Sequence, residues 1–494
     1  MKKILYAFII IALAAAGCNH SNQKTNQQQN QTAFELFTPI PSDFTTTAPI
    51  LPQGLEYDIL FSEKIDSVTK ADGKKYPARG MHDFTAYIPI DGSSTHGYLY
   101  VNHETGSRND HLGDGGGGTF FEIELKDGKW KAAGDFRHID FSTVGGTLRN
   151  CGGTVTPHKT ILTAEEAEPA DNKTLQPFFR DTSDFNGMKR FQHFGWMVEV
   201  DPFSGKALRK LYPMGRYMHE DALCDADGRT VYLTDDFTPS VFFKFVADAP
   251  ADYSSGQLYA YRQSADGESG DWITLPMAMD SLVKIRDVAM RMGATLFVRH
   301  EWIDGIGGKI YIAETGGDFF DWSIPVSMGA KPAKHFENLK KEENKFADPY
   351  GRILMFNPAT NKMSVYLEGG TSESDSTTNF AFPDGLRILP INGKNYLVIS
   401  EDIYVTSLNR VSKEAFAKGE IYNEIYFLDL SIGHPTIDNL QRFMAAPRGC
   451  ETTGSEFTPD GSTYFISIQH PDATNPEPFN RSTVIAVRMG KPLM

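Results

Sequence analysis

Three features are missing from this chain. Its 494 residues carry 48 Lys and Arg against 63 Asp and Glu, and this lack of a basic excess argues against a nucleic-acid partner. After the first residues, no apolar run is long enough to span a bilayer. Patterns typical of long amphipathic helices are also missing. What the chain has is 12% aromatic residues and 44 glycines, which suits many short strands joined by tight turns.

The N-terminal segment "MKKILYAFIIIALAAAGC" has two lysines, an apolar stretch and small residues before Cys18. This order is typical of a secretion signal. Because "AAGC" is similar to a lipobox, residues 1–18 are expected to be a lipoprotein signal with lipid attached to Cys18; an ordinary signal peptide is the alternative. Residues 19–33 are polar and predict a flexible tether. The protein is therefore expected to be exported, periplasmic or at the cell surface, and held to a membrane by its lipid alone.

Cysteine is scarce: besides Cys18, the chain has only Cys151, Cys224 and Cys450. An odd number in an exported protein leaves at least one thiol outside any intramolecular disulfide. Cys224 stands just before a predicted strand and is interpreted as a core residue. Cys151 and Cys450 both lie in Gly-containing turns beside acids, so a disulfide between them remains possible.

One pattern recurs six times along the chain: a short apolar strand that runs into polar or acidic residues. The copies are "YLYVNHETG" (98–106), "TILTAEEAE" (160–168), "TVYLTDDF" (230–237), "KIYIAETGGD" (309–318), "NYLVISEDI" (395–403) and "TYFISIQHP" (463–471). Other segments, such as "FFEIELKDGKWKA", "GWMVEVDPFSGKALRKL" and "GRILMFNPATNKMSVYL", predict strand–turn–strand units. Six such units predict an all-β fold for residues 34–494, a single six-bladed β-propeller with inserted loops, and favour it over a two-sheet sandwich.

A propeller would bring these strand ends together, because equivalent strands of all blades meet around one axis. The acids at the ends would repel one another and raise one another's pKa values, and bound cations would stabilise them. Hard oxygen ligands suit calcium or magnesium. The sequence therefore predicts a metal cluster at one mouth of the central channel.

Cys151, in "TLRNCGGTVTPHKTILTAEEAE", adds a different kind of donor. A thiolate is a soft ligand that selects transition metals over calcium, so one Cys among carboxylates indicates an iron or zinc site beside harder calcium sites. A nucleophilic Cys151 with His158 as its base is the rival interpretation, although nearby acids would raise the pKa of the thiol. A plain buried cysteine is the third.

Several stretches resemble, in the same order along the chain, the PhoX family of bacterial alkaline phosphatases. They are "YVNHE", "GTLRNCGGTVTPHKTILTAEE", "MGRYMHED", "VRHEW", "DPYGRI", "FPDGL" and "GCETTGSEFTPDG…IQHP". The resemblance implies a six-bladed propeller that holds two ferric ions and three calcium ions and that releases phosphate from phosphoesters. The chain has Arg-His-Glu where the family has Arg-Pro-Glu, and His158 where a Trp is usual.

The resemblance also implies roles for individual residues. Cys151 would bind iron. Acidic metal ligands are expected among Glu165 or Glu166, Glu220 and Glu301, with Glu104, Asp236, Asp384 and Glu451 as further ligands, to calcium or in support. Arg299 would hold the phosphoryl oxygens in the transition state. Independently of the resemblance, Arg149 is a second candidate for this role because it stands two residues before Cys151. An oxygen held between metals, or a metal-bound hydroxide, would attack phosphorus in line.

These expectations define one function and two alternatives. The first is an exported, monomeric, metal-dependent phosphatase that acts on small phosphoesters, most of all monoesters. A calcium-dependent propeller lactonase or esterase would need carboxylates and one hard cation, but no thiolate. A membrane-tethered propeller that binds a glycan or protein without catalysis would leave the acids as scattered, solvated turns.

Overall fold

β-Strands dominate the computed structural model, which describes residues 36–267, 269–321, 328–342, 345–348, 350–370, 380–404 and 408–489. Among these residues, no helix has the length and apolar character needed to cross a membrane. The predicted signal segment 1–18, its Cys18 and the tether 19–33 lie outside the described residues.

Three larger sheets are formed by residues between 67 and 274. The first contains β2 (Ser67–Thr69), β3 (Lys75–Pro77), β4 (His82–Pro89), β5 (His96–His103), β6 (Gly117–Lys126), β7 (Lys129–Ala132) and β8 (Phe136–His138). The second contains β9 (Asn150–Val155), β10 (Ile161–Glu165), β11 (Met197–Asp201) and β12 (Lys206–Lys210). The third contains β13 (His219–Cys224), β14 (Thr230–Asp235), β15 (Phe243–Ala249), β16 (Asp252–Gln263) and β17 (Gly270–Thr274).

Three more follow later in the chain. The fourth contains β19 (His300–Ile306), β20 (Lys309–Glu314), β25 (Arg352–Asn357) and β26 (Lys362–Glu368). The fifth contains β27 (Pro383–Ile391), β28 (Lys394–Glu401), β29 (Glu424–Asp429) and β30 (Gln441–Ala445). The sixth combines β31 (Glu451–Phe457), β32 (Thr463–Gln469) and β33 (Thr483–Arg488) with β1 (Glu56–Ser62). Since β1 pairs with β33, strands from both ends of the chain complete this sheet.

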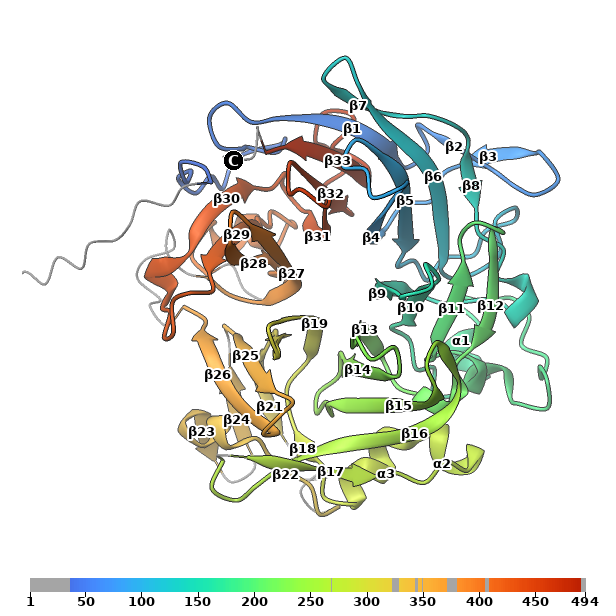
Figure 1. Ribbon diagram of the computed structural model, residues 1–494, viewed down its shortest axis with the longest axis vertical. Helices are drawn as coiled ribbons and strands as arrows, with labels where there is room; N and C mark the ends of the chain where they lie inside the picture. Colours follow the sequence, from blue (N-terminus) through green and yellow to red (C-terminus); the bar gives the residue numbers. More distant parts are fainter. Residues whose placement is uncertain are drawn as a thin grey trace, which may run out of the picture. The chain divides into compact units, whose positions relative to one another are not determined.

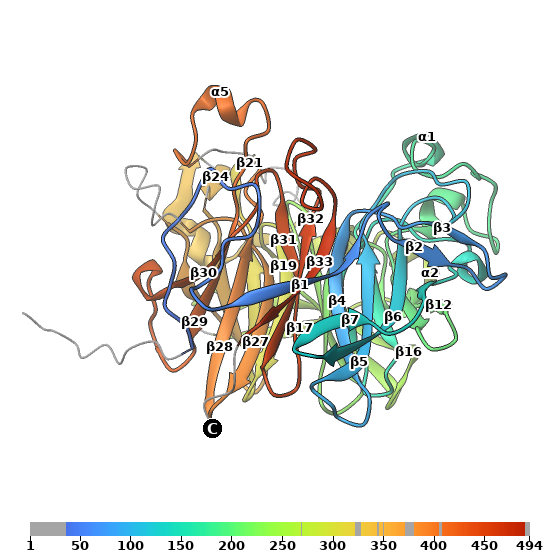
Figure 2. The ribbon, with the colours of Figure 1, turned by 90° about the horizontal axis from the view of Figure 1, so that it is seen from above.

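Small elements fill the connections. Two minor sheets are formed by β18 (Thr295–Leu296) with β22 (Lys331–Pro332), and by β21 (Gly317–Asp321), β23 (Lys340–Glu342) and β24 (Lys345–Asp348). The described helices are short: α1 (Asn172–Leu175), α2 (Met279–Leu282), α3 (Ile285–Arg291), α5 (Lys413–Phe416), η1 (Ser142–Val144), η2 (Arg190–His193), η3 (Tyr212–Met214), η4 (Lys334–Leu339) and η5 (Ile437–Asn439). Figure 2 shows α1 and α5 on the same side of the sheets.

The larger sheets are arranged like a propeller around a central axis (Figure 1). Their innermost strands are β4, β9, β13, β19, β27 and β31; each contacts the next, and β31 contacts β4. The six repeated segments of the sequence form β5, β10, β14, β20, β28 and β32, and each pairs with the innermost strand of its sheet. The predicted all-β, propeller-like arrangement is confirmed, and so are the three strand–turn–strand units, which form the pairs β6–β7, β11–β12 and β25–β26.

Burial explains why the second strand of each sheet, formed by the repeated segment, is so apolar. β10, with the sequence ILTAE, is buried along its whole length, because neighbouring sheets cover both of its faces. Leu162, Leu233 and Ile312, from three successive sheets, share one hydrophobic cluster. Side chains also fill the axis itself: the rings of Phe84 in β4 and Trp302 in β19 meet with centroids 6.0 Å apart. The channel is therefore blocked by side chains at this level.

Candidate metal centre and active site

The acidic strand ends converge on one cavity of about 540 Å³. Cys151, Arg149 and Arg299 line it together with eight carboxylates: Glu104, Glu166, Glu220, Asp236, Glu301, Asp384, Asp402 and Glu451. Every residue that the sequence predicts for this site therefore lies in the cavity, with the exception of Glu165. Segments that are hundreds of residues apart have become neighbours, as expected for a ring of blades.

Five of the donor groups stand at the same place in successive sheets, as the second residue of the innermost strand. They are Asp83, Cys151, Glu220, Glu301 and Asp384. In all six inner strand pairs the register is interrupted, in five of them beside this residue. Such irregularities re-aim a side chain that regular pleating would place elsewhere. The repeated bulge thus explains how these groups come to lie close together, four of them in the lining of one cavity.

The second set of acids occurs as adjacent pairs at the end of the next strand outward: Glu165–Glu166, Asp235–Asp236 and Glu401–Asp402. Successive residues of a strand point to opposite sides, and the pairs divide accordingly. The second acid of each pair lines the cavity.

The first acid of each pair is buried against a base instead. Lys210 Nζ donates to Glu165 Oε1 over 2.8 Å. The guanidinium of Arg286 binds both oxygens of Asp235 over 2.6 and 2.8 Å, and that of Arg410 binds both oxygens of Glu401 over 2.8 Å each. The same arrangement recurs in three sheets. In each of them, a buried base neutralises the first acid of the pair.

The sequence predicts Glu165 as a possible metal ligand, but its carboxylate does not line the cavity. Besides Lys210, its carboxylate accepts hydrogen bonds from Thr147 Oγ1 and from the backbone N–H groups of Gly195 and Trp196. These partners satisfy its lone pairs, so it supports the strand end while Glu166 faces the cavity. The sequence left the choice between the two open because both follow the same strand.

Cys151 lies at the centre of the donor groups. Its Sγ atom is 3.0 Å from both carboxylate oxygens of Glu220. Ligand atoms of Asp83, Glu104 and Cys151 lie within 4.8 Å of one another, as do those of Glu220, Glu301 and Asp384. Both groups could hold a metal ion. One offers sulfur with oxygen, and the other offers oxygen alone.

Backbone contacts fix the position of Cys151. Asn102 Nδ2 donates to the carbonyl oxygens of Cys151 and Gly152 over 2.6 and 3.1 Å. A Cβ atom on Gly152 would lie 2.3 Å from the carbonyl oxygen of Glu220, a separation that atoms cannot adopt. The glycine after the cysteine therefore allows β9 and β13 to approach closely enough for the thiol to meet Glu220.

Burial and like charge perturb the acids strongly. Burial, followed by the charges of Glu301 and Asp384, raises the pKa of Glu220 well above its ordinary value. Burial and the charge of Asp236 raise the pKa of Glu166 to about 7, and burial raises that of Asp83 to about 6. The thiol of Cys151 also has its pKa raised well above the ordinary value, by burial and then by the charges of Asp83 and Glu220. Without bound cations, these acids and the thiol therefore keep their protons to a higher pH than the same groups do in water.

These surroundings argue against Cys151 as a nucleophile, because a nucleophilic thiol needs a lowered pKa and a base. His158 cannot be that base: it is exposed and lies in the turn after Val155, whereas Cys151 stands at the opposite end of the same strand, β9. All three described cysteines are free, so the disulfide between Cys151 and Cys450 is also excluded.

The two predicted arginines occupy equivalent positions. Arg149 and Arg299 each directly precede an innermost strand, and both have left-handed backbone, with φ values of 47° and 52°. A side chain in this conformation is strained, and here it reaches the cavity. Arg299 donates to Asp236 from Nε over 2.7 Å and lies 3.0 Å from Glu301. Arg149 is more exposed, 3.6 Å from Glu166.

Arg299 stays charged in this setting. Burial works against the charge of its guanidinium, but the carboxylates of Asp236 and Glu301 outweigh burial and raise the pKa well above its ordinary value. A fixed cation is thus held among the acids that line the cavity.

The sequence prediction missed Asp83 as a donor and did not assign Asp402 a role. Both had a signal. Asp402 is the second acid of its pair, as Glu166 and Asp236 are of theirs. Asp83 belongs to a repeated His–acid dipeptide, present as Met-His-Asp at 81–83, Met-His-Glu at 218–220 and Arg-His-Glu at 299–301. In these three copies the acid is the second residue of an innermost strand.

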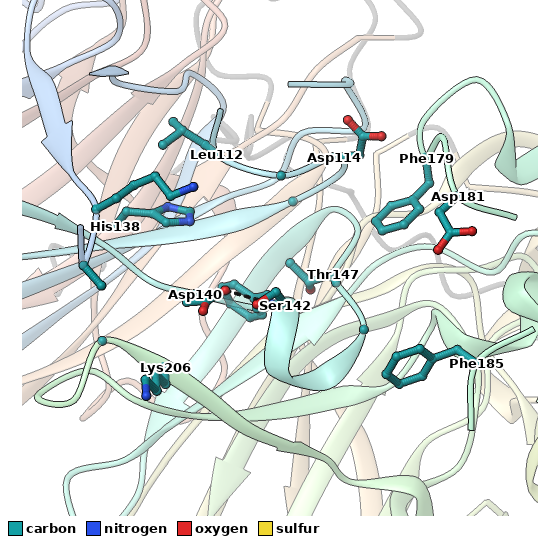
Figure 3. A pocket seen from close by; sticks show the side chains of 18 of the residues that line it. Leu112, Asp114, His138, Asp140, Ser142, Thr147, Phe179, Asp181, Phe185 and Lys206 are labelled. Atoms are coloured by element: carbon teal, nitrogen blue, oxygen red, sulfur yellow. Dashed lines mark hydrogen bonds between the residues drawn. The ribbon is translucent and has the colours of Figure 1, made fainter. Parts of the chain in front are cut away.

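Figure 3 shows a second cavity, of about 550 Å³. It mixes basic side chains such as Lys206 and Arg190 with Asp140, Asp181 and the rings of Phe179 and Phe185. Neither candidate metal group contributes to it. Of these two cavities in the described part of the chain, the one with the converging acids combines candidate metal donors with a fixed cation, so the candidate active site is there.

Comparison with known proteins agrees with this geometry. The sequence profile of the family described as Alkaline phosphatase PhoX matches residues 129–472. The chain belongs to the PhoX family. As a member of this family the protein is a phosphoric ester hydrolase, and the expected substrates are small phosphorylated compounds.

Solved structures add the fold. Pseudomonas fluorescens PhoX in complex with vanadate, described as a transition state analogue, is 23% identical, with a TM-score of 0.69 over 92% of this chain and 97% of that chain. Trypanosoma rangeli sialidase in complex with sialic acid (10% identity, 90% of this chain and 60% of that chain) has a TM-score of 0.42. A gluconolactonase from Xanthomonas campestris (11% identity, 90% of this chain and 98% of that chain) has a TM-score of 0.35. Scores this low carry no functional information. No curated protein sequence matches the chain.

Proposed function

We propose that this PhoX-family protein is a metal-dependent phosphomonoesterase whose cations are held by Cys151 and the surrounding carboxylates. The observation that carries the proposal is the convergence of one thiol, the carboxylates and a fixed guanidinium on a single cavity. Eight acids and one thiol around one cavity need compensating positive charge, and Arg299 alone cannot supply it. Gln469, whose side-chain polar atoms are buried with no hydrogen-bond partner among the described residues, lines the same cavity. A donor set of this kind fits bound cations.

The donor chemistry supports two kinds of ion. The group that contains Cys151 suits a transition metal, and the all-carboxylate group of Glu220, Glu301 and Asp384 suits a hard cation. Two ferric ions and three calcium ions, as the family resemblance implies, are the composition we propose. When bound, such ions supply Lewis-acid polarisation of the phosphoryl group and lower the pKa of attacking water.

The side chains of the protein then have separate tasks. Glu220 and Cys151, ionised once cations replace their protons, hold the centre. Arg299 presents its guanidinium to the equatorial oxygens of the phosphoryl group, where negative charge accumulates in the transition state. Asp236 orients Arg299 through the 2.7 Å hydrogen bond. Arg149, at the equivalent position of another sheet, contacts the substrate from the rim.

We also propose that the ring counts six blades. The support is that six innermost strands contact one another in succession and that six copies of the sequence repeat lie beside them.

The cellular setting is proposed from the sequence. The segment that ends in "AAGC" supports export and lipid attachment at Cys18, and residues 19–33 support a flexible tether to a bacterial membrane. A propeller that closes on itself supports a monomer, because its sheets have partners within the chain.

Elemental analysis of the purified protein, paired with an aryl phosphate assay before and after chelation, tests the function. Iron with calcium, and phosphate release that chelation abolishes, is the expected result. Calcium alone without phosphate release would favour a lactonase. A protein that holds no transition metal and has no hydrolytic activity would favour a binding propeller.

A further inference from the structure

The cavity is larger than a phosphoryl group needs. Pockets of about 300–1,000 Å³ typically hold a whole small organic ligand, and this cavity measures about 540 Å³. Bound cations would take up part of this volume, and we expect the leaving group of the ester to lie against the part of the described lining that is not occupied by metal donors. Most of that lining is acidic, and acids repel a phosphate ester, so the apolar side chains of the lining decide which leaving groups are accepted.

Two aromatic side chains, Phe178 and Tyr404, belong to the lining. Phe178 lies three residues after α1, and Tyr404 lies between β28 and α5. Both segments are on the side of the ring where α1 and α5 project (Figure 2). The two rings thus come from separate insertions, one in the second sheet and one in the fifth.

Each ring is paired with one of the two arginines. The guanidinium of Arg299 lies over the ring of Tyr404, 5.3 Å from its centroid, and that of Arg149 lies over Phe178 at 5.9 Å. The rings consequently stand next to the groups proposed to contact the phosphoryl oxygens. An ester bound there places its leaving group beside a ring.

The positions of these rings are specific. A Cβ atom on Gly106 would lie 2.9 Å from Cδ1 of Phe178, so the loop that carries Phe178 packs directly on the glycine that follows Thr105. Tyr404 is 46% exposed, an unusual degree for a large aromatic side chain. Its ring lies beside Arg299 and the ring of Phe382, and part of it remains exposed at the cavity.

We propose that Phe178 and Tyr404 determine the substrate class of this enzyme, by selecting phosphomonoesters whose leaving group carries a planar ring, such as a nucleoside or an aryl alcohol. The inference rests on the proposed phosphomonoesterase function. Stacking against either ring adds favourable contact area at little entropic cost, since an aromatic side chain has few rotatable bonds. An aliphatic polyol leaving group offers no matching surface.

The test compares adenosine 5′-monophosphate with glycerol 3-phosphate. Both release a primary alcohol, so their intrinsic reactivities are similar and the ratio of kcat/KM values reports on recognition. The wild-type protein should prefer the nucleotide. Phe178→Leu and Tyr404→Ala should each reduce the ratio about 2- to 10-fold, by raising KM for the nucleotide alone.

Ring-retaining substitutions provide matched controls. Phe178→Tyr and Tyr404→Phe should keep the wild-type ratio, and Ile65→Ala, at a position 48% exposed outside the cavity lining, should change nothing. Adenosine, which has the ring but no phosphate, should inhibit the wild-type protein competitively. It should inhibit Tyr404→Ala less strongly.

The outcomes separate the two proposals. If neither ester is hydrolysed by a protein with its full metal content, the proposed function fails. If both are hydrolysed and the ratio is the same in wild type, Phe178→Leu and Tyr404→Ala, the function stands and the role of the rings is refuted. An equal loss of activity toward both esters would also refute it, because the rings would then act on the phosphoryl site.

Discussion

The Sγ atom of Cys151 lies 3.0 Å from both carboxylate oxygens of Glu220, although 69 residues separate them along the chain. The two residues stand at the same place on adjacent inner strands, β9 and β13. Burial raises the pKa values of both groups, so without a cation they retain protons. A cation that binds here replaces those protons, and the pairing of a soft with a hard donor gives the centre its selectivity.

Replacing the sulfur tests that selectivity. We expect Cys151→Ser to lose the transition metal while it retains calcium, because a hydroxyl is neither soft nor ionised at neutral pH. Phosphate release should fall with the loss of iron, as measured by elemental analysis and an aryl phosphate assay. Cys224→Ser, in a free cysteine that contacts Tyr253 instead, should leave both unchanged. Unaltered iron in Cys151→Ser would remove the thiol from the metal site.

Glu165 and Glu166 are adjacent and have opposite expected effects. Glu165→Gln removes the partner of Lys210, whose side chain is 1% exposed, so the free energy of unfolding should fall by about 3–5 kcal/mol. Glu166→Gln removes one of the mutually repelling acids of the cavity, so it should weaken cation binding without loss of stability in the metal-free protein. Denaturant unfolding after chelation and metal titration measure the two effects. The reverse result would exchange the roles of the two residues.

Arg299 is expected to act on the transition state. Arg299→Lys keeps the charge but loses the fork that binds two oxygens at once, so kcat should fall about 100-fold or more while metal content is retained. Arg209→Lys, which alters an ion pair with Glu199 on the second sheet, is the matched control. It should leave kcat and metal content unchanged. A parallel loss of metal and turnover in Arg299→Lys would show that Arg299 holds the ligands, not the substrate.

Gly152 should tolerate no side chain. Because a Cβ atom there would lie 2.3 Å from the carbonyl oxygen of Glu220, Gly152→Ala must push β9 and β13 apart. We expect a loss of about 1–3 kcal/mol in stability together with weaker metal binding, measured by thermal unfolding and metal titration. Gly134→Ala, with nothing within 4 Å of its added Cβ atom, should be neutral. Normal metal affinity in Gly152→Ala would mean that the spacing of the two strands is not critical.

The metal-free protein should have an inverted pH dependence. Asp83 and Glu166 have pKa values raised to about 6 and about 7 in the folded state, so the folded protein binds protons more tightly than the unfolded chain does. Stability that is present near pH 4 should therefore be lost as the pH rises toward 7. Calcium should restore this stability, most strongly near pH 7, and its binding should release protons. Thermal unfolding of chelated protein across this range, with and without calcium, gives the answer; a rise in stability with pH would contradict it.

Much of this arrangement could be read from the sequence. The six apolar segments that end in polar residues do form the second strand of six sheets, and the turns with Asp-Gly, Ser-Gly and Asn-Pro do connect strands. These features are local: alternation, burial and turn chemistry are encoded within a few residues. The Cys, Glu and Asp residues of the motifs were also expected to converge, because a propeller brings equivalent strand ends together.

Other features depended on contacts between segments far apart. Nothing near Glu165 indicates that Lys210, 45 residues later, neutralises it while Glu166 faces the cavity. The repeated His–acid dipeptide marks Asp83 in the sequence, but its place beside Glu104 and Cys151 depends on the contact between β4 and β9. The pairing of Phe178 and Tyr404 with two arginines involves insertions whose paths no local pattern specifies.

The sequence by itself determined which residue types end each strand and how many times they recur, because strand and turn preferences act over short distances. Only the tertiary structure decided which acid of each pair faces the cavity. That choice depends on the strand alternation, on the interrupted register of the inner strands and on the bases that neutralise the outward-facing acid, and distant parts of the chain supply these together.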